Sequence, residues 1–550
     1  MSELTLDQYF ALIKNRTLKP LSAHERLYRA FIWGQEKGMF AHLIGMEHIL
    51  KEFEQRFLFP AAKDYDTQKR LWLFVGPPGS GKSTFVQTLK HVLIEFSKTD
   101  EGSVYRLKGC PMQENPLWAL PENERTIIKE EIGLTINGTL SPYNQQRLEQ
   151  DYQNDWRQLL VERFELSEQE RLGIGTFMPG DWYTQDLSDL LGDIDYAKVT
   201  QYGTSSDPRA YRYDGEVQAA NQGLLELHEV LKCRHDLLYP FLTLAEQSIY
   251  KVSRQAMIFS DLVMIGHSTL SDWQSFSEDE RNHSLLKRMS VLFVPYNLNL
   301  QQEVAHYKHY VHQEDQDKFA PKAIECIALT AILSRFQYSE NRRIYQEIVT
   351  MKSGKDLPFQ KGDGLDGLDT RLIYRILDRC ISMNSKITVQ ELLEELRLQV
   401  EDDLTITKAS KAWYHHLITC VLKHFETELI YRIETEIIND YQEELNEIVE
   451  KASQSPELLK QWFGLSNDVI ASFQSQRNLI HEQNLFVHLD SEYQKLFQQK
   501  LMQNVLQKLN GESKLRKALA KYLETIEDGR YTPYFSELIK LVNERYIIHR

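Results

Sequence analysis

The segment Gly76–Ser83 constrains the fold of this 550-residue chain more than any other part of its sequence. It reads GPPGSGKS, which fits the phosphate-binding pattern GxxxxGK[ST], and it directly follows the apolar run Leu71–Val75. A glycine-rich turn lets several backbone N–H groups converge on phosphate oxygens, and the positive end of a following helix adds to the attraction. The pattern therefore predicts a strand, a phosphate-binding loop and a helix over Thr84–Phe96.

The loop residues predict a site for a nucleoside triphosphate. Lys82 is expected to reach the β- and γ-phosphates, and the Ser83 hydroxyl to bind Mg²⁺. The residues expected to hold the nucleotide are Gly76, Pro77, Pro78, Gly79, Ser80, Gly81, Lys82, Ser83 and Thr84. The motif alone does not separate kinases, GTPases and motor ATPases, so the remaining groups must come from later strands of the same sheet.

Length and composition favour a multidomain globular protein. At 550 residues with 42% hydrophobic residues, the chain can form roughly two to four packed units. We expect a cytoplasmic protein without a membrane partner, because no apolar run approaches about 20 residues and MSELTLDQYF lacks the layout of a secretory signal. A net charge of −15 disfavours nucleic acid as a partner. The five cysteines are scattered singly, which argues against zinc and against a disulfide framework.

The spacing of apolar residues predicts four regions. Residues 1–70 read as helices, 71–302 as an α/β core, 303–402 as a helical lid and 403–550 as a helical C-terminal domain. Helices alternate in the core with short buried strands, which implies a parallel sheet. These strands are expected at Leu71–Val75, Val104–Leu107, Gly223–Leu227, Leu262–Gly266 and Val291–Val294.

Three further segments have distinctive patterns. The stretch from Gly102 to Ala220 is rich in Gly, Pro, Asp and Tyr, which is typical of functional loops or small inserted elements. The segment KGDGLDGLDTR (361–371) predicts a turn before a helix over Leu372–Ser382. An apolar stripe from Phe425 to Ile448 predicts a long helix; core packing is the favoured interpretation, and a partner helix is the alternative.

The segment Asp214–Lys232, DGEVQAANQGLLELHEVLK, resembles the part of AAA+ proteins where an apolar strand ends in Asp-Glu. In those proteins the Asp supports magnesium and the Glu polarises water. Here His228 stands at the Asp position and Glu229 follows, so the resemblance implies that Glu229 activates water or a hydroxyl. Glu226 would share the face of His228 but lie about 6 to 7 Å further back along the strand. Ordinary packing roles for Glu226 and His228 remain open.

Three more positions match the AAA+ pattern. Thr269 follows a predicted strand, where AAA+ proteins carry a polar residue that reads the γ-phosphate. Arg288 precedes the next strand and resembles the arginine finger, which acts on the ATP of a neighbouring subunit and so implies a homo-oligomer. Arg371 matches the lid arginine that touches the γ-phosphate. An ordinary surface charge is the alternative for any single arginine.

Together these stretches resemble the PrkA family of bacterial serine protein kinases, whose N-terminal portion is an AAA+ module. The resemblance rests on AHERLYRAF (23–31), VGPPGSGKS (75–83), YRLKGCPMQENPL (105–117), RLGIGTFMPGD (171–181), YGTSSDPRAYRYDGE (202–216) and FVPYNLNLQQE (293–303). YQEELNEIVEKA and EDGRYTPYFSELIKLV look similar to the family's helical end. The family implies ATP and Mg²⁺ as ligands, a protein substrate, transfer of the γ-phosphate to serine with Glu229 aligning the hydroxyl, and a role in bacterial stress responses.

Two alternatives remain beside the kinase. The chain has no HRDxxxxN, DFG or VAIK motif of ordinary protein kinases. It could instead be an oligomeric ATPase that remodels or delivers a protein client, with Tyr105–Trp118 or Phe177–Tyr183 as contact loops. It could also be a nucleotide-gated scaffold, because the missing Asp at His228 would leave binding intact and hydrolysis feeble.

Overall fold

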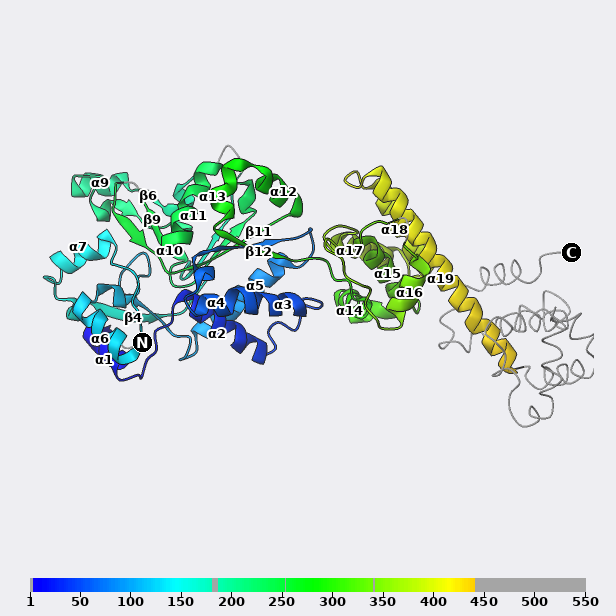
Figure 1. Ribbon diagram of the computed structural model, residues 1–550, viewed down its shortest axis with the longest axis horizontal. Coiled ribbons are helices and arrows are strands. Elements are labelled where there is room, and N and C mark those ends of the chain that lie inside the picture. The colour runs from blue at the N-terminus through cyan, green and yellow to red at the C-terminus, as the bar shows by residue number, and fades with distance from the viewer. Residues whose placement is uncertain (1–2, 181–185, 253, 340–341, 441–550) are drawn as a thin grey trace, which may run out of the picture. The chain divides into compact units, whose positions relative to one another are not determined.

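The computed structural model describes residues 3–180, 186–252, 254–339 and 342–440 (Figure 1). The chain divides into two compact units. Of the described residues, the first holds those up to Glu303 together with Arg335–Gln337 and Phe359–Arg371; the second holds Val304–Ser334, Tyr338–Pro358 and those from Leu372 to Asp440. The segment 361–371, which the sequence groups with the lid region, thus belongs to the first unit. Most of the predicted C-terminal domain and the end of the apolar stripe lie outside the described residues.

A five-stranded parallel sheet forms the centre of the first unit. Its strands, in spatial order, are β12 (Met289–Phe293), β2 (Leu71–Val75), β11 (Val263–Ser268), β8 (Leu224–His228) and β5 (Ile174–Phe177). Every residue of β2 and β11 is buried, as expected for a parallel sheet covered on both faces. The parallel α/β core predicted from the sequence is confirmed, and β11 separates β2 from β8.

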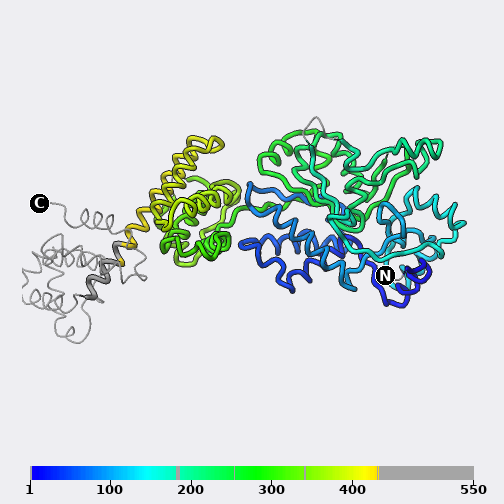
Figure 2. The backbone as a smooth tube through the Cα atoms, turned by 180° about the vertical axis from the view of Figure 1, so that it is seen from behind, coloured from blue at the N-terminus to red at the C-terminus, as the bar shows by residue number. Residues whose placement is uncertain are grey.

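Helices cover both faces of this sheet (Figures 1 and 2). On one face, Trp72 and Phe74 pack with Phe53 and Phe85, and Phe74 stacks on Phe85 with a ring separation of 5.3 Å. The helices of this face are α2 (Ala23–Glu36), α3 (Glu47–Phe53), α4 (Phe59–Ala62) and α5 (Lys82–Ser97). The helices of the other face are α10 (Glu216–Ala219), α11 (His235–Gln247), α12 (Leu270–Glu278) and α13 (His283–Leu286).

Smaller elements fill the stretch between Gly102 and Ala220. The predicted strand Val104–Leu107 exists as β3, but the expectation that it joins the parallel sheet is wrong, because it pairs antiparallel with β4 (Leu160–Phe164) in a separate sheet. The other strands outside the central sheet are β1 (Leu4–Thr5), β6 (Asp193–Ile194), β7 (Tyr211–Arg212), β9 (Ile249–Lys251) and β10 (Met257–Phe259). The accompanying helices are α1 (Leu6–Lys14), α6 (Glu122–Ile132), α7 (Pro142–Gln150), α8 (Ser188–Leu191) and α9 (Tyr196–Tyr202).

The second unit is helical in its described part. Of the predicted apolar stripe, the structure describes the side chains of Phe425 and Leu429, and both are buried in the long helix of this unit. The core-packing interpretation of the whole stripe stays a prediction. The helices that contribute to this unit are α14 (Leu300–Tyr310), α15 (Ala323–Arg335), α16 (Ile344–Lys352), α17 (Thr370–Met383), α18 (Val389–Asp402) and α19 (Lys408–Asp440). No helix among the described residues has both the length and the apolar character needed to cross a membrane. All five cysteines are free.

Candidate functional site

The loop Gly76–Gly81 leaves the end of β2 and leads into α5, as the sequence predicts. Gly79 and Gly81 have φ angles of +74° and +89°, in the left-handed region where glycine alone is unstrained. A Cβ atom at Gly76 would overlap the carbonyl oxygen of Val294. These glycines are therefore required by the path of the backbone, which wraps tightly around the first turn of α5.

Lys82 folds back onto the loop. Its Nζ donates hydrogen bonds to the carbonyl oxygens of Gly76 (2.8 Å) and Pro77 (2.7 Å), and its side chain is buried. Burial lowers the pKa of Lys82 to about 8; the nearby charge of Arg371 lowers it further, and Asp369 opposes the shift. Ser83 and Thr84 are exposed in the same first turn.

Groups from distant parts of the chain support the loop. The hydroxyl of Tyr296 donates to the carbonyl oxygen of Pro78 at 2.7 Å. The sulfur of Met46 lies 3.0 Å from the position that a Cβ of Gly81 would take. The sequence gives no local signal for these contacts, although Tyr296 lies within the segment FVPYNLNLQQE. They hold the loop at Pro78 and at Gly81.

Arg371 lies beside the loop, in the region that the sequence analysis assigns to it. Its Cγ is 3.5 Å from the position of a Cβ at Gly79, and the Asp369 carboxylate would overlap that Cβ. The backbone N–H of Arg371 donates to Asp369 at 2.8 Å, which fixes the start of α17 next to Gly79. Lys82 and Arg371 thus place two cations at one phosphate-binding loop. Asp369 is a neighbour that the sequence analysis missed.

Glu229 lies at the open end of β8. Its backbone is left-handed, with a φ of +45°, and its exposed carboxylate pairs with Lys232 at 2.8 Å. Because β11 lies between β2 and β8, Glu229 is displaced from the loop by two strand spacings, or about 10 Å. This separation leaves room for a phosphate and an acceptor group. The catalytic role of Glu229 stays a prediction.

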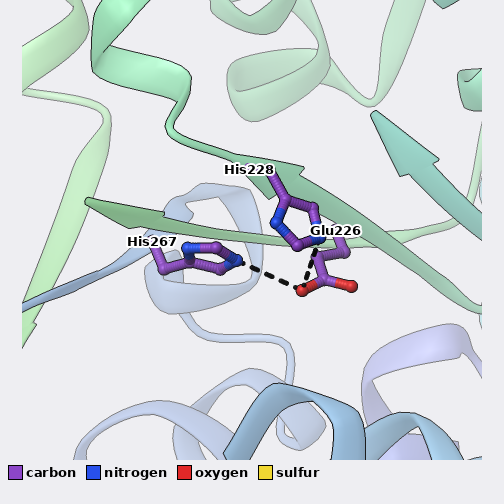
Figure 3. A group of neighbouring side chains, drawn as sticks. All are labelled: Glu226, His228 and His267. Atoms are coloured by element: carbon purple, nitrogen blue, oxygen red, sulfur yellow. Dashed lines mark hydrogen bonds and ion pairs between the residues drawn. The ribbon is translucent and has the colours of Figure 1, made fainter. Parts of the chain in front are cut away.

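Glu226, His228 and His267 form a compact group, here called the Glu–His cluster (Figure 3). The Nε2 atoms of His228 and His267 lie 3.1 and 3.2 Å from the same oxygen, Oε1 of the fully buried Glu226. The other oxygen pairs with Nζ of the buried Lys90 at 2.6 Å. Burial by itself would raise the pKa of Glu226, but the bonds from His228, His267 and Lys90 hold it well below its usual range. The His228 side chain is thus turned toward Glu226.

Thr269 and Arg288 have structural partners within the chain. Thr269 follows β11 and caps α12: its Oγ1 accepts from the backbone N–H of Asp272 at 3.2 Å. Arg288 precedes β12 and pairs with Glu246 at 2.6 Å near the surface. Both positions relative to the strands agree with the sequence analysis, and their roles toward a nucleotide stay predictions.

The two segments suggested as contact loops for a protein client differ in how far their side chains are buried. In Tyr105–Trp118, the side chains of Cys110, Met112 and Glu114 are buried, and Gln222 donates to the carbonyl oxygen of Gln113 at 2.7 Å. This packing argues against a client-binding role for that segment. Of Phe177–Tyr183, the structure describes the residues up to 180, among which Met178 is exposed.

Comparison with known proteins identifies the family. The family described as "PrkA AAA domain" matches residues 2–343. This chain belongs to the PrkA family. It is 33% identical over 467 residues to "ATP-dependent protease PrkA" of Bacillus subtilis (strain 168), which covers 80% of this chain and 74% of that protein. It is 27% identical over 372 residues to "Serine/threonine kinase YeaG" of Escherichia coli (strain K12), which covers 63% of this chain and 56% of that protein.

Membership of the PrkA family confirms the AAA fold expected for the core. An AAA domain implies ATP binding and an ATP-dependent activity, and the loop residues fit that ligand. The two relatives carry different activities in their names, a protease and a kinase, so the family match leaves the final acceptor of the phosphoryl group open. Among solved structures, a complex of the magnesium chelatase subunits BchI and BchD is 16% identical, covering 63% of this chain and 91% of that one, with a TM-score of 0.27.

Proposed function

We propose that this chain is an ATP-dependent protein serine kinase whose phosphoryl donor binds at the loop Gly76–Thr84. The observation that carries the proposal is that Lys82 and Arg371 lie at the same loop, Lys82 at Gly76 and Pro77 and Arg371 beside Gly79, because two cations at a glycine-rich loop attract the negative charge of a triphosphate. Lys82 has backbone carbonyls as hydrogen-bond partners, which phosphate oxygens can replace. The family membership and the name of the E. coli relative support the same activity.

Each residue has a distinct part in this proposal. The first turn of α5 receives the phosphates, and Ser83 in that turn holds Mg²⁺, which neutralises charge on the transferring group. Arg371 approaches the γ-phosphate from the side of Gly79, and the Thr269 hydroxyl contacts the γ-phosphate from the end of β11. Glu229 accepts the proton of the substrate serine, which requires its ion pair with Lys232 to open. That pair is exposed, so opening it costs little.

A second candidate function is ATP hydrolysis in an oligomer that drives work on a protein client. Arg288 favours it, because this arginine is partly exposed at the start of β12 and its partner Glu246 is exposed as well. In an oligomer, the γ-phosphate of the ATP bound to a neighbouring subunit could replace Glu246 as the partner of Arg288. The name of the B. subtilis relative, an ATP-dependent protease, is compatible with this function.

The fate of the γ-phosphate decides between the functions. The full chain is incubated with γ-labelled ATP, Mg²⁺ and a bacterial protein extract, and label is measured as phosphoserine and as free phosphate. We expect phosphoserine from the wild type and a loss of at least about 100-fold in Lys82→Ala. Glu229→Gln should lose transfer but retain nucleotide binding. The exposed Lys98→Ala and Glu278→Gln are matched controls and should behave as wild type.

Three outcomes would contradict the kinase. Phosphoserine that persists in Lys82→Ala would place the donor site elsewhere. Label that appears only as free phosphate would favour the ATPase, and label that remains on ATP would favour a nucleotide-gated scaffold. For the ATPase, Arg288→Ala should lower turnover in mixed oligomers, and a chain that is monomeric by light scattering at full turnover would exclude a finger acting between subunits.

A further inference from the structure

We propose that the Glu–His cluster binds one divalent transition-metal ion, such as Zn²⁺, in addition to the Mg²⁺ expected with the nucleotide. The inference rests on the geometry of Glu226, His228 and His267 alone and does not depend on the proposed function. It gives His228 a function of its own at the position where AAA+ proteins carry an Asp.

Strand register assembles the three side chains. His228 of β8 lies directly opposite His267 of β11, so both side chains emerge on the same face of the sheet. Glu226 lies two residues before His228 and therefore shares that face. The ligand atoms of all three lie within 4.8 Å of one another (Figure 3). No displacement of the backbone is needed to bring two imidazoles and a carboxylate to one point.

The separations between each imidazole and the carboxylate match those of ligands on one ion. Bonds of about 2.1 Å place neighbouring ligand atoms about 3.0 Å apart at right angles and about 3.4 Å apart in a tetrahedron. The two distances from Nε2 to Oε1 of Glu226 are 3.1 and 3.2 Å. Without an ion both Nε2 atoms serve as hydrogen-bond donors; with an ion each ring carries its proton on Nδ1 and offers the Nε2 lone pair.

The donor set selects the class of metal. Two imidazoles and one carboxylate suit Zn²⁺, Fe²⁺, Co²⁺ or Ni²⁺, whereas Mg²⁺ and Ca²⁺ prefer oxygen ligands. Lys90 adds a second feature of metal sites, because it holds Oε2 of Glu226 at 2.6 Å and leaves Oε1 toward the histidines. Partners of this kind fix the orientation of a metal-binding carboxylate.

Exposure indicates how an ion would enter. Glu226 is fully buried and His267 nearly so, but the side chain of His228 retains 21% of its exposure. The ion therefore reaches the cluster past His228, and water can complete the coordination on that side. Ser268, the residue after His267, accepts from the backbone N–H of Gly76 at 3.4 Å. His267 is thus the immediate neighbour of the residue whose backbone bonds to the first glycine of the phosphate loop.

Cobalt titration of the full chain tests the site. The chain is stripped with chelator, Co²⁺ is added, and the visible d–d absorption is followed; Zn²⁺ should then displace the Co²⁺. We expect one ion per chain, with nitrogen and oxygen ligands and without thiolate charge-transfer bands. His228→Ala should weaken binding at least about 100-fold, since even outer partners of metal ligands are worth 10- to 100-fold.

Controls separate this site from others. The exposed His283→Ala should bind Co²⁺ as the wild type does. His267→Gln should also lose binding; if this buried change prevents folding, judged by circular dichroism, the half-buried His228→Ala decides the question. Absence of stoichiometric binding or equal affinity in His228→Ala and the wild type would overturn the proposal. Thiolate bands would also overturn it, because they would place the ion at a cysteine such as Cys420, whose Sγ lies 3.5 Å from Nε2 of His416.

Discussion

The phosphate loop and the Glu–His cluster border the same parallel sheet but are built in opposite ways. The loop takes its ligands from Gly76–Thr84, a single run between β2 and α5. The cluster takes Glu226 and His228 from β8 and His267 from β11, with Lys90 from α5 beside them. The first depends on local backbone conformation, and the second on strand register and on burial of charge.

This difference predicts different responses to mutation. Changes at the glycines or at the exposed Ser83 and Thr84 should reduce nucleotide binding and leave the fold largely intact, because these residues contribute no packed side chain to the core. Changes at Lys90 or Glu226 should reduce stability, because a buried ion without its partner is strongly destabilising. The comparison is therefore tested by measuring binding and unfolding on the same variants.

The largest expected effect is on stability, from Lys90→Met. Removal of this buried ammonium leaves Glu226 charged and without its ion-pair partner, which should lower the free energy of unfolding by about 3–5 kcal/mol in urea denaturation. Lys98→Met, at the exposed end of the same helix, is the matched control and should change it by less than about 0.5 kcal/mol. Adding Glu226→Gln to Lys90→Met should restore part of the lost free energy of unfolding. If Lys90→Met alone unfolds within about 1 kcal/mol of the wild type, which is on the order of experimental error, the cluster does not depend on buried charge in the way proposed.

An intermediate effect is expected at Gly79. Gly79→Ala should weaken ATP binding about tenfold, since the new methyl group meets both a left-handed backbone and the Asp369 carboxylate. Gly133 is a matched control: its φ is +77°, but no atom lies within 4 Å of the Cβ position. Gly133→Ala should therefore cost only about 1 kcal/mol of stability and leave binding unchanged. Equal ATP affinity in the two variants, measured by calorimetry, would argue against close contact at Gly79.

The smallest expected effect is proton uptake at Lys82. Burial lowers its pKa to about 8, so at pH 8 the nucleotide-free chain holds about half a proton there. Bound phosphates favour the charged form and should raise that pKa, so ATP binding should take up about half a proton at pH 8, measured by calorimetry in buffers of different ionisation enthalpy. Lys82→Arg, which stays charged, should show none of this uptake.

Lys82 also predicts how the stability of the nucleotide-free chain changes with pH. Because the pKa of Lys82 is lower in the folded chain than its ordinary 10.5, the folded state holds fewer protons between about pH 8 and pH 10.5. The free-energy cost of burying the charged Lys82 ammonium is present in full below about pH 8, and it disappears as the pH rises from about 8 to 10.5. The wild type should therefore gain stability relative to Lys82→Met over this range; a constant difference would show that Lys82 is not desolvated.

The sequence predicts the local features of the site and misses those that depend on pairing. Leu71–Val75 is predicted with its full extent, and three other strands of the sheet within one or two residues. β5 is missed because Gly175 and Thr176 interrupt its apolar pattern, and β3 is placed in the wrong sheet because strand pairing leaves no local trace.

The Glu–His cluster was out of reach for the same reason. The position of Glu226 in the sequence places it too far back along β8 to replace the missing Asp. His267, which lies opposite His228 in the sheet, is 39 residues away from His228 along the chain. Lys90 is the available signal, because it lies on the same face of α5 as the buried Val86 and Leu93. A lysine on the buried face of a helix requires an anionic partner, and Glu226 meets that need.

The left-handed backbone at Glu229 has a consequence for how this chain can evolve. A non-glycine residue with a φ of +45° costs on the order of 1 kcal/mol, which glycine would avoid. Drift toward stability therefore favours loss of the carboxylate at the end of β8. Under the proposed function, a relative with Gly or Asn at this position would be more stable and would lack the serine-activating carboxylate, so the residue found there should distinguish active from inactive members of the family.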